Sequence, residues 1–227
     1  MSIEKKSNIL NSLKKSLLYE GLTMDELNLV YEQTRPVVRA YDRDEIIVAQ
    51  GSKVSSIGLI KSGTVASIKY DLNGEAQVLR TYKQGGVICL DTLYSKSKIS
   101  PVALVCQTDC LIGFTPFLKL FESTFIGPAT REKILHNIAH ILSDEHVQLI
   151  FKIDLLSMYT LEERIMTYLR HIKDKSGQDT FDIGLTQKQF ADFLWVNRSV
   201  LSTELNRMRK EGLIDYEKSR FKILAAE

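Results

Sequence analysis

No stretch of this 227-residue chain is both long and apolar. A helix that crosses a bilayer needs about 18 or more consecutive apolar residues, and the hydrophobic runs here are shorter and broken by charges. Residues 1–15 are charged and contain no apolar core segment, so they do not form a secretory signal. The sequence therefore predicts a protein without a membrane span, and the expected location is cytoplasmic.

Cysteine is also scarce. The chain has only Cys89, Cys106 and Cys110, an odd number that does not suit a disulfide framework. An iron–sulfur cluster usually takes four thiolates, and no clustered histidines accompany these three, so we expect no metal site. Cys106 and Cys110 are four residues apart in a strand-like stretch, which would place both on one face. Buried structural cysteines are favoured over a redox pair.

Charge of one sign is not in excess either. The 30 Lys and Arg residues oppose 28 Asp and Glu residues, for a net charge of +2, so any basic surface for nucleic acid must be local. No nucleophile is paired with a base in a recognisable motif, and an enzyme is not expected. Hydrophobic residues make up 44% of the chain, which is typical of a globular protein, and the length favours two modest domains.

Residues 37–117 have the texture of an antiparallel β-structure. Short apolar runs alternate with glycine-containing turns, which predicts a β-sandwich or barrel. The strongest hairpin signal is Asn73-Gly74, because both turn residues must adopt positive φ. The expected strands cover residues 45–49, 57–60, 65–70, 76–82 and 102–106. Residues 1–35, by contrast, are helical in pattern, and Thr23 with Glu26 predicts a capping box that begins a helix.

A single long helix is predicted over residues 128–157. Pro128 suits its first position, and about 30 residues at 1.5 Å each would span about 45 Å. Leucine recurs every seven residues, which is typical of a coiled-coil dimer seam. The alternative is that these leucines pack on the chain's own β-domain, and Glu145 and Lys152 interrupt the repeat. The candidate dimerisation residues are Leu135, Ile138, Leu142, Leu149 and Leu156.

Residues 185–224 contain two short helices, a tight turn and two strands. Thr186 with Gln189 predicts one helix, and Asn197 is placed to cap a second over residues 198–210. The small Ala191 lies where the two would approach, as in a helix-turn-helix. We expect Val200, Leu201, Leu205 and Met208 to form the buried stripe of the second helix. The strands that follow, with a basic turn between them, read as a wing.

The exposed side of this second helix carries hydrogen-bonding residues that suit a major groove. Residues 198–222 hold seven basic and four acidic residues, a local excess of +3. A winged helix used for protein contacts is the alternative, but the coincidence of motif, polar face and basic wing favours DNA. The candidate DNA-binding residues are Thr186, Gln187, Arg198, Ser199, Ser202, Thr203, Asn206, Arg207, Lys218 and Arg220.

From about residue 20 onward, the chain resembles bacterial transcription regulators of the Crp–Fnr family. The likeness rests on the order of the parts and on residues 60–65 (a strand–glycine–strand motif), 163–165 and 185–202. It implies an α+β fold with an N-terminal sensor domain over residues 1–127. That domain would be a double-stranded β-helix, or jelly roll, of the cyclic-nucleotide-binding type. A dimerisation helix over 128–157 and a winged helix-turn-helix over 158–227 would follow.

The chain also departs from the family pattern. Nucleotide-binding members carry a Gly-Glu-Leu triplet and a later arginine that pairs with the cyclic phosphate, whereas residues 88–91 here read Ile-Cys-Leu-Asp and Ser100 stands at the arginine position. A buried phosphate without a charged partner is costly, so cyclic AMP is not expected to be the effector. The candidate effector pocket comprises Ile88, Cys89, Leu90 and Ser100.

Other departures from the family pattern concern the expected cofactor and the recognition helix. Residues 1–35 lack the cysteines of the family's iron–sulfur branch, and all four histidines lie beyond the β-region, so haem is not expected. In the recognition helix Arg198 is kept, while Ser199 and Thr203 replace the family's usual Glu and Arg. The sequence thus predicts a homodimeric regulator that binds palindromic double-stranded DNA, responds to a small-molecule effector and contacts RNA polymerase. The alternative is a ligand-binding module that acts on a protein partner.

Overall fold

The computed structural model describes residues 3–70, 76–116 and 118–224. It divides into two compact units, residues 1–145 and 146–227, and the division falls inside the long helix α5 (Pro128–Leu156). The predicted Asn73-Gly74 turn lies outside the described residues. Within the described ranges, no helix combines the length and the apolar character that a bilayer crossing needs.

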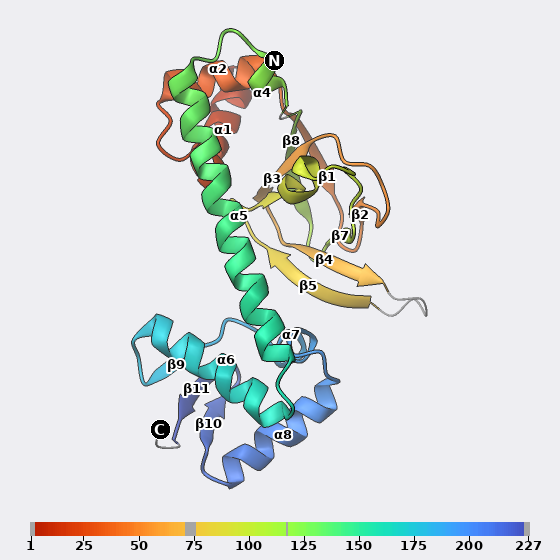
Figure 1. Ribbon diagram of the computed structural model, residues 1–227, viewed down its shortest axis with the longest axis vertical. Helices are drawn as coiled ribbons and strands as arrows, with labels where there is room; N and C mark the ends of the chain where they lie inside the picture. Colours follow the sequence, from red (N-terminus) through yellow and green to blue (C-terminus); the bar gives the residue numbers. More distant parts are fainter. Residues whose placement is uncertain (1–2, 71–75, 117, 225–227) are drawn as a thin grey trace. The chain divides into compact units, whose positions relative to one another are not determined.

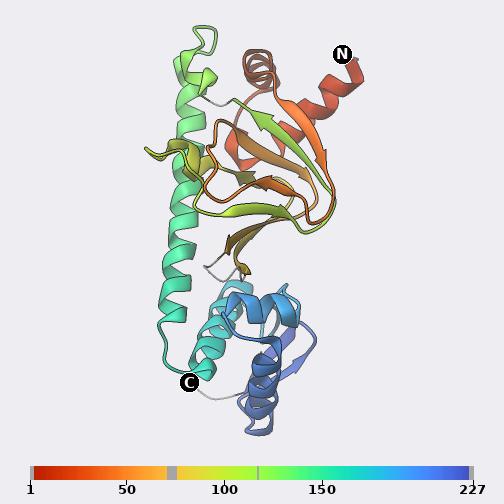
Figure 2. The ribbon, with the colours of Figure 1, turned by 90° about the vertical axis from the view of Figure 1, so that its right-hand side faces the viewer.

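Two four-stranded antiparallel sheets form the β-roll of the first unit (Figure 1, Figure 2). One has the order β1-β8-β3-β6 and the other β2-β7-β4-β5. The strands are β1 (Val37–Tyr41), β2 (Ile46–Val48), β3 (Ile57–Ser62), β4 (Val65–Tyr70), β5 (Ala76–Tyr82), β6 (Val87–Ile88), β7 (Ala103–Cys106) and β8 (Cys110–Thr115). The five runs predicted from the sequence are confirmed as strands. The sequence analysis missed β1, β6 and β8. Strand β1 is largely exposed, β6 is only two residues long, and β8 is interrupted by a glycine.

Gly63 explains the strand–glycine–strand motif. It lies between β3 and β4 with a φ of +90°, a conformation that L side chains rarely adopt. A Cβ at this position would press on the Asp109 carbonyl oxygen and lie 2.9 Å from the Cys110 Cα. Only glycine therefore fits the close approach of this turn to the start of β8.

The three cysteines are free and buried, as expected of structural thiols. Their predicted arrangement needs a correction, because Cys106 and Cys110 do not lie along one strand. Cys106 ends β7 and Cys110 begins β8, and the turn between them includes Thr108, whose carbonyl oxygen accepts a hydrogen bond from the Cys110 Sγ at 3.1 Å. The polar residues of this turn reverse the chain, so the spacing of four does not reflect a strand period.

Helices cover one side of the β-roll. They are α1 (Ile3–Lys14), the 3₁₀ turn η1 (Leu17–Tyr19), α2 (Met24–Thr34), α3 (Leu90–Tyr94) and α4 (Lys119–Glu122). The capping box at the start of α2 is confirmed: the Glu26 backbone N donates to the Thr23 Oγ1 at 3.2 Å, and the Thr23 N donates to the Glu26 Oε2 at 2.7 Å. Glu26 also accepts from Lys133 Nζ at 2.9 Å, which fixes the first turns of α5 against α2.

Between the end of α5 and residue 224, the last that the structure describes, the second unit contains three helices and a small sheet. These are α6 (Leu161–Ser176), α7 (Gln187–Phe193) and α8 (Arg198–Lys210), with β9 (Thr180–Asp182), β10 (Ile214–Glu217) and β11 (Arg220–Ile223) in the order β10-β11-β9 (Figure 1). Thr160 and Glu163 form a capping box for α6, and Gly177 ends that helix with φ +63°. Phe190, Leu201 and Phe221 are among the fully buried side chains of its core.

Candidate DNA interface

Helices α7 and α8 form the predicted helix-turn-helix. The Thr186 Oγ1 accepts from the Gln189 backbone N at 3.3 Å and begins α7. Ala191 is only 1% exposed, and its carbonyl oxygen accepts from the Val196 N at 3.1 Å. This backbone hydrogen bond closes the turn, and the small Ala191 side chain is buried beside it. Asn197 occupies the cap position of α8 as expected, but its side chain forms no capping hydrogen bond.

Helix α8 separates a buried stripe from a polar face. Leu201, Leu205 and Met208 are fully buried, as predicted, whereas Val200 is 49% exposed. The correction follows from helix geometry: Val200 is next to Leu201 in sequence and therefore points about 100° away from it. Burial of three residues is enough to hold the helix on the core and leaves its other side to solvent.

The predicted reading residues lie on that exposed side. Arg198, Ser199, Thr203 and Asn206 are exposed, and Ser202 is half-buried. The Thr203 Oγ1 donates to the Ser199 carbonyl oxygen at 3.0 Å, and the Asn206 Oδ1 accepts from the Tyr216 hydroxyl at 3.2 Å.

Arg198 is the first residue of α8. No ion pair holds it among the residues that the structure describes. A cation at a helix N-terminus opposes the helix dipole, so Arg198 does not serve the stability of its own helix and remains available for an external partner.

The wing brings further predicted residues to the same unit. Lys218 and Ser219 form the turn between β10 and β11, and Lys218 and Arg220 are exposed. Thr186, Gln187 and Lys218 line one groove of about 700 Å³. Helix α7 and the wing, which are separated in sequence, therefore share a surface.

Two polar contacts hold the wing in place. The Asp182 carboxylate accepts from the Gly184 N at 2.7 Å and from the Ser219 Oγ at 3.1 Å, and these hydrogen bonds lower its pKa. Arg209 of α8 forms an ion pair with Asp215 of β10 at 2.9 Å, and the Arg209 guanidinium lies 5.6 Å from the centre of the Tyr216 ring. Helix α8 and β10 are thereby tied together.

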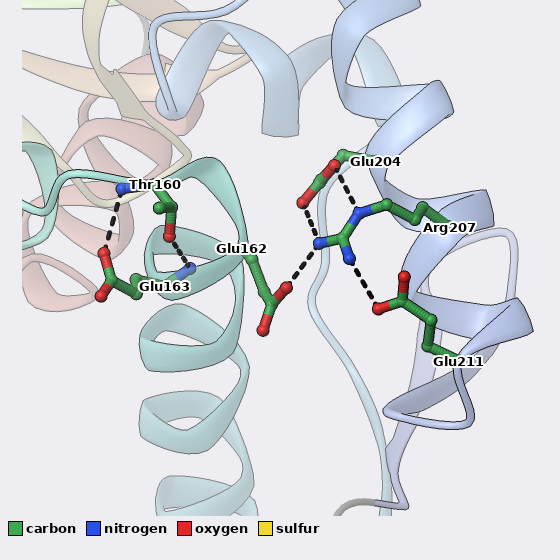
Figure 3. A network of polar contacts seen from close by, with 6 residues as sticks. All are labelled: Thr160, Glu162, Glu163, Glu204, Arg207 and Glu211. Atoms are coloured by element: carbon green, nitrogen blue, oxygen red, sulfur yellow. Dashed lines mark hydrogen bonds and ion pairs between the residues drawn. The ribbon is translucent and has the colours of Figure 1, made fainter.

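The side chain of Arg207, a candidate DNA-binding residue, is engaged within the protein. Its guanidinium does not extend freely from α8 but is bound by the carboxylates of Glu162, Glu204 and Glu211 (Figure 3). Sequence polarity alone placed Arg207 with the reading residues. The missing signal was the set of three surrounding glutamates, one of which, Glu162, lies on α6.

The predicted dimerisation residues of α5 differ in their exposure. Leu135 and Leu149 are 48% and 57% exposed, while Leu142 and Leu156 are half-buried. Ile138 is 6% exposed and belongs to the core of the first unit, so it packs on its own chain and is not available to a second one. A side chain that the sequence analysis did not include, Ile153, is 56% exposed on the same side of α5 as Leu149.

The two breaks in the leucine repeat have partners within the chain. Glu145 accepts an ion pair from Arg80 of β5 at 2.7 Å, and burial raises its pKa. The Lys152 ammonium lies 4.8 Å from the centre of the Phe193 ring, and burial lowers its pKa to about 8. Both positions therefore face their own unit and not the exposed stripe.

The candidate effector residues are all buried. Ile88, Cys89 and Leu90 belong to the hydrophobic core of the first unit, and the Ser100 Oγ donates to the Val102 carbonyl oxygen at 2.7 Å. Cys89 has a φ of +68° at the start of α3, and burial raises the pKa of its thiol to about 12. None of the four candidate effector residues has a carboxylate or a guanidinium group.

Comparisons with known proteins agree with this architecture. The model of the Crp-like helix-turn-helix domain matches residues 163–227, and that of the cyclic nucleotide-binding domain matches residues 38–123. Among curated relatives, the electron transport regulator A of Shewanella oneidensis is 27% identical over 199 residues, 85% of this chain and 75% of that protein. The transcriptional activator protein FnrA of Stutzerimonas stutzeri is 22% identical over 206 residues, 88% of this chain and 80% of that protein.

Solved structures show the same fold. The global regulator CLP of Xanthomonas campestris, described as responsive to c-di-GMP, has a TM-score of 0.68 at 16% identity and covers 90% of this chain and 100% of that one. A CooA mutant from Carboxydothermus hydrogenoformans also has a TM-score of 0.68, at 17% identity, and covers 91% of this chain and 88% of that one. With a cyclic-nucleotide-binding β-roll, a long helix and a Crp-like helix-turn-helix in this order, the chain belongs to the Crp–Fnr family of transcription regulators.

Proposed function

We propose that the protein is a homodimeric regulator that binds a palindromic DNA site through α8 and the wing, under the control of a ligand of the β-roll. The observation that carries the DNA-binding role is Arg198, an exposed guanidinium without an ion-pair partner among the described residues, at the N-terminus of α8. Arginine at this position of a recognition helix can donate two hydrogen bonds to guanine O6 and N7. Lys218 and Arg220 are placed to bind phosphates.

The exposed apolar stripe of α5 supports the homodimer. Leu135, Leu149 and Ile153 are each about half exposed on one side of the helix, which is costly for a solitary surface helix but typical of a coiled-coil seam. Two copies paired along this stripe would present two recognition helices related by a twofold axis. The matching DNA site would be palindromic.

The effector is proposed to be something other than cyclic AMP. The chain retains the β-roll of nucleotide-binding relatives, but Leu90 and Ser100 lack the charges that a ribose and a cyclic phosphate require. RNA polymerase is the proposed protein partner, because the relatives are transcription regulators.

Quantitative binding to a selected DNA site tests the proposal. Arg198→Ala should cost about 1–3 kcal/mol per half-site and relax the preference at one base pair. Arg220→Ala is the matched control: it should weaken binding about equally on all sequences and lower the salt slope by about one. If Arg198→Ala left base preferences unchanged while Arg220→Ala altered them, the assignment of reading to α8 and anchoring to the wing would be wrong.

A further inference from the structure

Arg207 lies at one edge of the exposed side of α8, about 40° around the helix from the reading residue Thr203. It follows Arg198 by nine residues, which is about 2.5 turns at 3.6 residues per turn. The two guanidiniums therefore leave the helix in opposite directions. Arg207 is next to Thr203 on the exposed side, and it is the ion pairs of its guanidinium within the protein that set it apart from the reading residues.

The donors of Arg207 are almost fully used inside the protein. The Nε donates to Glu204 Oε2 at 3.2 Å and one Nη to Glu204 Oε1 at 2.7 Å; the other Nη donates to Glu211 Oε2 at 2.6 Å. A further hydrogen bond reaches Glu162 (Figure 3). A guanidinium has five N–H donors, and these four hydrogen bonds leave one.

The charge around Arg207 also disfavours a phosphate. Three carboxylates surround one guanidinium, so this group of four side chains, which we call the Arg207 clamp, has a net charge of −2. The carboxylates raise the pKa of Arg207, which stays charged throughout. A DNA phosphate that approached the clamp would meet more negative than positive charge.

The clamp adds a polar connection between α6 and α8, whose buried side chains share one apolar core. Glu204 and Glu211 belong to α8 and its end, but Glu162 belongs to the first turn of α6. That turn is itself fixed by the Thr160–Glu163 capping box (Figure 3). Apolar packing is non-directional, whereas a guanidinium fork bound to carboxylates fixes geometry.

We infer that Arg207 is a positioning residue: it sets the orientation of α8 on α6, and thereby the base preference, without contacting DNA. The inference rests on the proposed DNA-binding function but makes its own predictions. Without the clamp, the orientation of α8 relative to α6 should vary more, because apolar contacts alone do not fix it. The fit of all reading residues to the base edges would then suffer together.

The experiment compares Arg207→Ala, Arg207→Lys and the control Arg220→Ala on specific and random DNA over a range of salt concentrations. Arg207→Ala should lower the ratio of specific to non-specific affinity by about tenfold and leave the salt slope unchanged. Arg207→Lys keeps the charge but cannot span three carboxylates, so it should fail to restore the ratio. A slope reduced by about one in Arg207→Ala and restored by lysine would identify a phosphate contact and overturn the inference, as would an unchanged ratio.

A second measurement needs no DNA. Urea unfolding of Glu162→Gln, Arg207→Gln and the double variant forms a double-mutant cycle, with the exposed wing residue Glu217→Gln as a charge-removal control. The clamp predicts that the double variant is about as stable as Arg207→Gln alone, because Glu162 has no guanidinium left to bind, whereas Glu217→Gln adds independently to Arg207→Gln. Additive effects of Glu162→Gln and Arg207→Gln would overturn the inference. If the wild type bound DNA without preference, the proposed function would fail while this cycle still tested the clamp.

Discussion

Replacement of the exposed apolar side chains of α5 should convert the proposed dimer into monomers. Full burial of a leucine or isoleucine side chain contributes about 1.5–3 kcal/mol. Leu135, Leu149 and Ile153 are 48%, 57% and 56% exposed, so each has roughly 1 kcal/mol still to gain, or roughly 6 kcal/mol for three residues in two copies. Leu149→Asp with Ile153→Asp removes about 4 kcal/mol of this and sets carboxylates against each other. The dimer should weaken by about a thousandfold or more.

Light scattering and sedimentation velocity at micromolar concentration measure this change. Val147→Asp is the matched control, because Val147 is 65% exposed but lies about 200° around the helix from Leu149. The wild type and Val147→Asp should be dimers, and the Leu149→Asp, Ile153→Asp variant should be a monomer of unchanged helical content. If the double variant stayed a dimer, or if Val147→Asp also dissociated, the stripe would not be the seam.

Three further predictions concern the effector, pH and the helix-turn-helix. Calorimetric titration with cyclic AMP should show no binding at micromolar concentration, because Leu90 and Ser100 offer no charge; saturable heats would contradict this. Burial lowers the pKa of Lys152 to about 8, so between pH 8 and its ordinary value near 10.5 the unfolded chain binds more protons and stability rises with pH. Urea unfolding should show this rise in the wild type, and an equal rise in Lys152→Met would refute the assignment. Thr186→Ala should cost about 1 kcal/mol in the same assay, and a change near zero would remove its role as a cap.

The features predicted correctly from the sequence are those set by local chemistry. The bounds of α8 and the capping boxes at Thr23 and Thr186 depend on residues within one turn of each other, so their patterns are readable without tertiary structure. The wing strands follow from short apolar runs on either side of a basic turn.

The features that sequence analysis missed depend on contacts between distant segments. Glu145 breaks the leucine repeat, yet its partner Arg80 lies on a strand far away in the sequence. Arg198 and Arg207 are both basic residues of α8, and the sequence does not show that Glu162 of α6 lies within ion-pairing distance of Arg207. Ile138 fits the seam by hydrophobicity, but the core of the first unit covers it.

Selection of bound sequences from a random pool of double-stranded DNA tests the central claim most directly. The account predicts that the wild-type protein enriches a palindrome whose half-site centres are about 34 Å, one helical turn, apart. Each half-site should contain a guanine that is no longer enriched by Arg198→Ala. Recovery of an unenriched pool, or of a single unrepeated motif that Arg198→Ala selects equally well, would contradict a twofold-symmetric regulator that reads DNA through α8.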